Sequence, residues 1–107
     1  MSAAVSRQTK REWPADVLEF AAPRNLEPYL EPLLQALRRV FPTAKLIHAK
    51  LEEDLVVEGH WQVVFDVQIV GLSAVEARAS QKAWHQEMVS ICPSPFLPYF
   101  GLFLDVQ

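Results

Sequence analysis

Apolar and polar residues alternate along residues 60–70, HWQVVFDVQIV. The odd-numbered positions from Trp61 to Ile69 are apolar and the even-numbered positions from His60 to Gln68 are polar, with Val64 as the exception. Successive side chains of a strand point to opposite faces of a sheet, so this pattern predicts a strand with one face in a core and one face open. We expect any function to use the open face or the ends of the strands.

A second strand is predicted over residues 44–53, and the acidic connection that follows it, which ends in a glycine, predicts a hairpin with the first. Pairing Leu51 with Trp61 places the apolar positions of both strands on one face and sets Glu52 opposite His60. A slip of one residue would exchange the two faces, so the parity of this register matters more than the individual partners.

Apolar residues at three- and four-residue steps predict a helix over residues 26–41. Asn25 is the candidate N-cap of this helix. Pro32 falls inside it, where a proline removes a backbone hydrogen bond and clashes with the preceding turn. The helix therefore either kinks or begins its regular part at Pro32.

A second helix is predicted over residues 73–91, because Ser73 and Glu76 form a capping-box pattern at its start. Trp84 is expected on its inner face. Prolines follow this helix, and alternation of apolar residues over residues 99–106 then predicts a last strand.

Residues 16–21, DVLEFA, decide between two folds. Read as a short strand, which we favour, they give the order β-α-β-β-α-β and a ferredoxin-like fold. Read as the start of a helix, they leave α-β-β-α-β, an order that resembles the second type of KH domain and BolA-like proteins. Both are two-layer α+β sandwiches, with an antiparallel sheet of three to four strands and two helices on one face. No GxxG loop precedes the last strand, and we recognise no characterised family.

The length of 107 residues predicts one domain, over residues 13–107, after a flexible basic tail at 1–12. The tail carries three basic residues and one acidic residue, which leaves the remainder with seven basic and twelve acidic residues. An acidic body argues against nucleic acid as a partner, because binding to phosphates depends on cations. The chain has no apolar run long enough for a membrane span and no secretory signal, so we expect a cytoplasmic protein.

The sequence contains residue types that can bind metals or catalyse reactions, but their spacing predicts no metal, phosphate or catalytic site. In the predicted register His48 and His60 are about 13 Å apart at roughly 3.3 Å per residue, too far to share a zinc ion with His85. The three glycines are isolated and form no phosphate-binding loop, and no serine lies in a nucleophile-elbow context. We expect no metal, no cofactor and no catalytic set.

Two further features are expected to be structural. The acidic residues near the hairpin turn, Glu52, Glu53, Asp54 and Glu58, lack the spaced ligands and glycine of a calcium loop, so they predict a solvated turn. Cys92 is the only cysteine, which excludes an internal disulfide. It lies at the end of a helix, where the helix dipole disfavours a thiolate, and we expect it to be buried and unreactive.

The predicted open face mixes polar and apolar side chains, which is typical of a contact surface. The residues placed on it are Leu46, His48, Lys50, Glu52, His60, Gln62, Val64, Asp66, Gln68, Tyr99 and Phe103. The expected interaction surface consists of Leu46, His48, His60, Val64, Asp66, Tyr99 and Phe103.

The first functional hypothesis is a non-enzymatic module that binds a protein partner or a second copy of itself through this face. One alternative is a small enzyme that uses acid–base residues of the open face. Another is a single-stranded nucleic-acid binder that stacks bases on Tyr99 and Phe103, although the acidic body weakens it.

Overall fold

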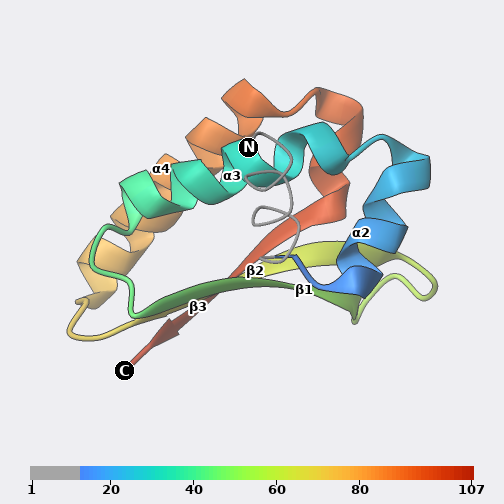
Figure 1. Cartoon of the computed structure of the whole chain (residues 1–107). Helices are drawn as coiled ribbons and strands as arrows, with labels where there is room; N and C mark the ends of the chain where they lie inside the picture. Colours follow the sequence, from blue (N-terminus) through green and yellow to red (C-terminus); the bar gives the residue numbers. More distant parts are fainter. Residues whose placement is uncertain (1–12) are drawn as a thin grey trace, which may run out of the picture.

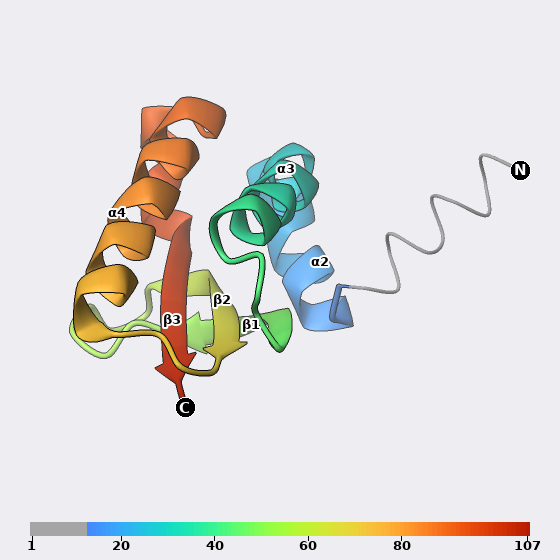
Figure 2. The ribbon, with the colours of Figure 1, turned by 90° about the vertical axis from the view of Figure 1, so that its left-hand side faces the viewer.

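The computed structural model describes residues 13–107, and the predicted tail at residues 1–12 lies outside them. The elements are α2 (Ala15–Ala21), η1 (Ala22–Arg24), α3 (Glu27–Val40), β1 (Leu46–Glu53), β2 (Trp61–Ile69), α4 (Ala74–Ile91), η2 (Ser94–Tyr99) and β3 (Phe100–Val106). The helices lie on one side of a three-stranded sheet (Figure 1). The opposite face of the sheet carries no helix (Figure 2). None of the helices described is long and apolar enough to span a membrane.

Residues 16–21 form most of helix α2, so the favoured first strand is wrong, and with it the ferredoxin-like order. Val17, Phe20 and Ala21 recur at helical spacing and are buried, which lets one face of α2 pack on the core. From α3 onward the order is α-β-β-α-β, the alternative that the sequence left open, with α2 added in front of it.

The sheet has the order β1-β2-β3 and is mixed. β1 and β2 are antiparallel, as the predicted hairpin requires, whereas β2 and β3 are parallel. The expectation of an antiparallel sheet is therefore wrong. Helix α4 carries the chain back across the sheet, and a strand that returns beside β2 after such a crossover runs in the same direction as β2. The α+β class and the placement of the helices on one face are confirmed.

The hairpin register differs from the predicted one by two residues. Leu51 faces Val63, and Glu52 faces Gln62. The parity is as predicted, so the faces are kept: Val63 and Phe65 are completely buried under the helices. Trp61 was expected in the core and is 43 % exposed, because it lies at the first position of β2.

The two longer helices begin differently. The N-cap of α3 is Leu26 and not Asn25, which has a φ of 60° and ends η1 in the left-handed conformation. Pro32 lies inside α3, which continues through it. At α4 the capping box is confirmed, with Ser73 Oγ accepting the Glu76 N–H at 3.1 Å and the Glu76 carboxylate accepting the Ser73 N–H at 3.0 Å.

Phe65 of β2 lies at the centre of an aromatic group between sheet and helices. Its ring contacts Trp13 and Trp84 edge-on, each with a centroid distance of 6.1 Å, and stacks with Phe100 at 6.4 Å. Trp84 is buried, as predicted. Trp13 and residues of β2, α4 and β3 thus meet in one core. This core covers one face of the sheet and leaves the other face open.

Candidate interaction surface

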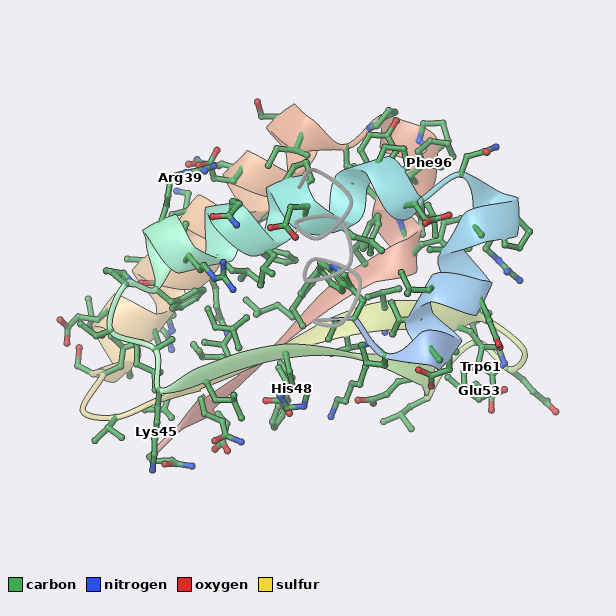
Figure 3. All side chains as sticks on the ribbon, in the orientation of Figure 1. Arg39, Lys45, His48, Glu53, Trp61 and Phe96 are labelled. Carbon is green, nitrogen blue, oxygen red and sulfur yellow. The ribbon has the colours of Figure 1, made fainter. Side chains whose placement is uncertain are left out.

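The strand pairing determines which side chains share the open face. His48 of β1 faces Asp66 of β2, which faces Phe103 of β3. Figure 3 shows His48 pointing away from the helices. Three residues of the predicted interaction surface are therefore adjacent across the sheet. The open face, as the structure defines it, comprises Leu46, His48, Lys50, Glu52, Gln62, Val64, Asp66, Gln68, Gly101, Phe103 and Asp105.

Charged groups form a small network in the middle of this face. Lys50 Nζ lies 2.8 Å from Glu52 Oε2 and 3.6 Å from Asp66 Oδ2, and His48 Nε2 lies 3.8 Å from the same Asp66 oxygen. The hydrogen bond to Glu52 is the main reason that the pKa of Lys50 is raised. Only 13 % of the Asp66 side chain is exposed, and its Oδ1 is buried without a hydrogen-bond partner.

Two apolar side chains project from the same face at its two edge strands. Phe103 on β3 is 53 % exposed, and Leu46 on β1 is similarly exposed. Lys50 Nζ lies 5.5 Å from the centroid of the Phe103 ring, within the range of a cation–π contact. Val64 differs from both, because it is only 7 % exposed. Neighbouring side chains cover most of Val64, so it offers a partner much less area than Phe103 or Leu46.

A hollow of about 500 Å³ occupies the end of this face nearest the hairpin turn. Val64 and Gly101 are among its lining residues, together with Lys50, Phe103 and Leu55. A side chain at Gly101 would meet the Gln62 amide at 3.4 Å. His48 and Asp66 do not line the hollow. The acid–base residues and the concave part of the face are therefore separate.

His60 and Tyr99 were expected on the open face, and the structure places them elsewhere. Tyr99 ends η2, where its ring packs against Phe20 at 6.0 Å and against His60 at 5.6 Å. His60 Nε2 lies 3.0 Å from the carbonyl oxygen of Pro98. The prolines of residues 94–99 favour a 3₁₀ helix over an extended strand, so β3 begins at Phe100. The two aromatic residues proposed to stack bases are thus not side by side on one face.

Two acidic residues of the hairpin accept backbone hydrogen bonds within the turn. The Asp54 carboxylate accepts the N–H groups of Val56 at 2.7 Å and Val57 at 3.1 Å, which lowers the pKa of Asp54. The Glu53 carboxylate accepts the N–H of Gly59 at 2.8 Å. Among residues 13–107, no group of three or more His, Cys, Asp or Glu side chains is placed to hold a metal ion. These carboxylates therefore act as turn-forming acceptors.

Sequence reasoning missed the apolar residues of that turn. We define the hairpin tip as Leu55, Val56 and Val57, all three of which are exposed, the first two almost completely. The signal was visible in the sequence, because three consecutive apolar residues in an otherwise acidic turn break the rule that exposed turns are polar.

The thiol of Cys92 lies inside the protein. Cys92 is buried beyond the end of α4, as predicted, and burial raises the pKa of its thiol. The neutral thiol is therefore favoured, and we place Cys92 with the core.

Comparison with known proteins assigns neither a family nor a function. No protein-family model matches the chain, and no curated protein or solved structure matches it either. Function is therefore inferred below from the geometry and chemistry of the surfaces alone.

Proposed function

We propose that this chain is a non-enzymatic protein-interaction module that binds a partner protein through its open face. The observation that supports this most is the exposure of Phe103 and Leu46 on strands whose other face forms the core. Aromatic side chains that project from a rigid sheet lose little conformational freedom on binding, which makes them effective anchors. The charged side chains of Lys50, Glu52 and Asp66 form a polar region beside these apolar residues, as at the rim of a protein interface.

The charge of the open face favours a particular kind of partner. Glu52, Asp66 and Asp105 outnumber Lys50 on this face, so its formal charge is negative with His48 neutral. A complementary surface would present apolar residues to Phe103 and basic residues to the carboxylates.

The test compares two variants that each add one negative charge at an exposed apolar position. Phe103→Glu changes the open face, and Val75→Glu changes the exposed surface of α4. Partners captured by the tagged wild-type chain are purified, and their affinities are measured by calorimetry. We expect Phe103→Glu to weaken binding at least about tenfold, or about 1.4 kcal/mol, and Val75→Glu to leave it unchanged. Equal binding by wild type and a folded Phe103→Glu variant would contradict the proposal.

A second copy of the chain is the other partner that this proposal allows. Two copies joined through the same face form a closed pair, because each face is then fully used. Size-exclusion chromatography with light scattering would then give a dimer for the wild type and a monomer for Phe103→Glu.

Acid–base catalysis is the second candidate function, and the approach of His48 Nε2 to Asp66 Oδ2 at 3.8 Å favours it. A catalytic pair needs a concave site that shields its substrate, and the hollow on this face does not include these two residues. NMR titration of the histidines tests this candidate. Ordinary and independent titration of His48 would remove it, and strong coupling to Asp66 would support it.

A further inference from the structure

We propose that the hollow at the hairpin end of the open face receives a lysine or arginine side chain of the partner protein. This inference deepens the function proposed above and rests on it, because it names the group of the partner that the face recognises. The lining of the hollow carries it, since an apolar surface lies there beside carboxylates that keep their charge.

The charged residues that line the hollow leave a net negative charge. They are Lys50, Glu52, Glu53 and Asp54. Lys50 and Glu52 form an ion pair with 2.8 Å between Nζ and Oε2, so their charges offset each other. Glu53 and Asp54 form no ion pair with another side chain of residues 13–107. Their negative charges therefore remain for a cation that a partner supplies.

Hydrogen bonds hold these two carboxylates without using both oxygens of either. Asp54 accepts the N–H groups of Val56 and Val57 through Oδ1, and Glu53 accepts the N–H of Gly59 through Oε2. Because the backbone donors lower the pKa of Asp54, its carboxylate is ionised at neutral pH. Asp54 Oδ2 and Glu53 Oε1 are left to accept charge-assisted hydrogen bonds from an ammonium or guanidinium group.

The apolar part of the lining suits the stem of such a side chain. Val64, Leu102 and Phe103 line the hollow, and Gly101 adds no side chain to it. Lysine and arginine bury their methylene groups on apolar surface while the charged end stays at a polar edge. A purely apolar side chain would cover the ionised carboxylates without pairing them, which is unfavourable. A long cationic side chain matches both parts of the lining.

The aromatic ring of the hollow attracts the same kind of group. Lys50 Nζ lies 5.5 Å from the centroid of the Phe103 ring, so a cation already occupies one position beside this ring. The Phe103 side chain is nevertheless more than half exposed, and its ring remains accessible to a second cation. The ring and the carboxylates of Glu53 and Asp54 thus favour the same occupant.

The first test uses blocked amino acids as probes and follows the amide signals of the isotope-labelled chain by NMR. Nα-acetyl-arginine methylamide and Nα-acetyl-lysine methylamide, at millimolar concentrations, should shift the signals of Val64, Gly101 and Phe103. The citrulline analogue has the shape of the arginine probe without its charge and should bind at least about tenfold more weakly. Added salt should weaken binding of the charged probes, because ions screen surface charges. No shift with either charged probe, or equal shifts with arginine and citrulline, would overturn the proposal.

Two substitutions remove the negative charges and keep the turn. Asp54→Asn and Glu53→Gln each retain a side-chain oxygen that can accept the backbone N–H groups. Each should weaken binding of the arginine probe about threefold, and the double variant about tenfold. Glu87→Gln, which removes a charge from α4 outside the hollow, is the control and should bind as the wild type does. Unchanged affinity in the double variant would contradict the proposal.

A third substitution fills the hollow. A Cβ at Gly101 would meet only the end of the Gln62 side chain, at 3.4 Å, and this flexible side chain can move aside. Gly101→Leu should therefore fold and lose binding of both charged probes. Gln68→Leu, on the open face outside the hollow, is its control and should keep it. Probe binding retained by a folded Gly101→Leu variant would place the probes elsewhere and overturn the proposal.

The captured partner separates this proposal from the preceding one. Weaker partner binding in both Phe103→Glu and Gly101→Leu would support the two together. Weaker binding in Phe103→Glu alone would overturn the role of the hollow and leave the open face as the binding surface. A partner whose binding neither variant changes would overturn both proposals.

Discussion

Val64 and Phe65 are neighbours in β2, both are buried, and they lie on opposite faces of the same sheet. Phe65 is enclosed by aromatic rings from three other segments of the chain. Val64 lies between Lys50 of β1 and Gly101 of β3, with no helix over it, and it is not part of the main core. The two side chains are therefore buried for different reasons. The helices cover Phe65, whereas side chains from the neighbouring strands of the same sheet cover Val64.

The largest effect is expected on the face under the helices. Phe65→Ala removes the ring that joins Trp13, Trp84 and Phe100, and it leaves a cavity that these large neighbours cannot fill. We expect the free energy of unfolding to fall by about 3–5 kcal/mol, measured by urea denaturation. A loss below about 1 kcal/mol would show that the helices do not pack tightly on β2.

Val64→Ala tests the other face and should cost less. It removes two carbon atoms at about 0.8 kcal/mol each, and the flexible Lys50 side chain beside it can settle into the space, so we expect a loss of about 1–2 kcal/mol. The same denaturation experiment compares it with Phe65→Ala. Equal losses would mean that the two faces are packed equally well.

Lys50→Gln should have a still smaller effect. The lysine is partly exposed, and exposed ion pairs contribute about 0–1 kcal/mol. We therefore expect a change below about 1 kcal/mol in the free energy of unfolding. A larger loss would show that Lys50 is needed to compensate the half-hidden carboxylate of Asp66.

The smallest effect on global stability is expected at the hairpin tip, which lies beyond the paired residues of β1 and β2. Hydrogen bonds from Val56 and Val57 lower the pKa of Asp54, so the ionised carboxylate stabilises the turn above the ordinary pKa of aspartate, about 3.9. This stabilisation should be lost as the pH falls through the lowered pKa. NMR should detect the Val56 and Val57 amide signals titrating together below a pH of about 3.9. Titration at or above that pH would contradict the turn geometry.

The parity of the strands was predictable because it depends only on local alternation. It correctly placed Val63 and Phe65 in the core and His48 and Asp66 on the open face. The exact hairpin register was not predictable, because the length and shape of the turn decide it. Here Asp54 and Glu53 hold a longer turn than expected, and every partner moves by two residues.

Other features depend on tertiary contacts and could not be predicted from the sequence pattern. An apolar stretch as short as residues 16–21 suits either a strand or a helix, and only contact with the core selected the helix. Tyr99 alternates correctly with Phe103 in the sequence, yet the preceding prolines hold it in a 3₁₀ turn against His60. The alternation of apolar residues alone does not show whether the prolines or the strand pattern will decide the conformation at Tyr99.

The spacing of apolar residues predicted a sheet with one apolar and one mixed face and two main helices, and the structure of residues 13–107 confirms both. Side-chain periodicity and motif spacing are local properties, so they can be read from the chain. The parallel pairing of β3 with β2, the cover over Val64, the exposure of Leu55 and Val56 and the groove between α3 and α4 become visible in the folded chain alone. Each of these depends on which distant segments lie side by side, and that is set by packing of the whole chain.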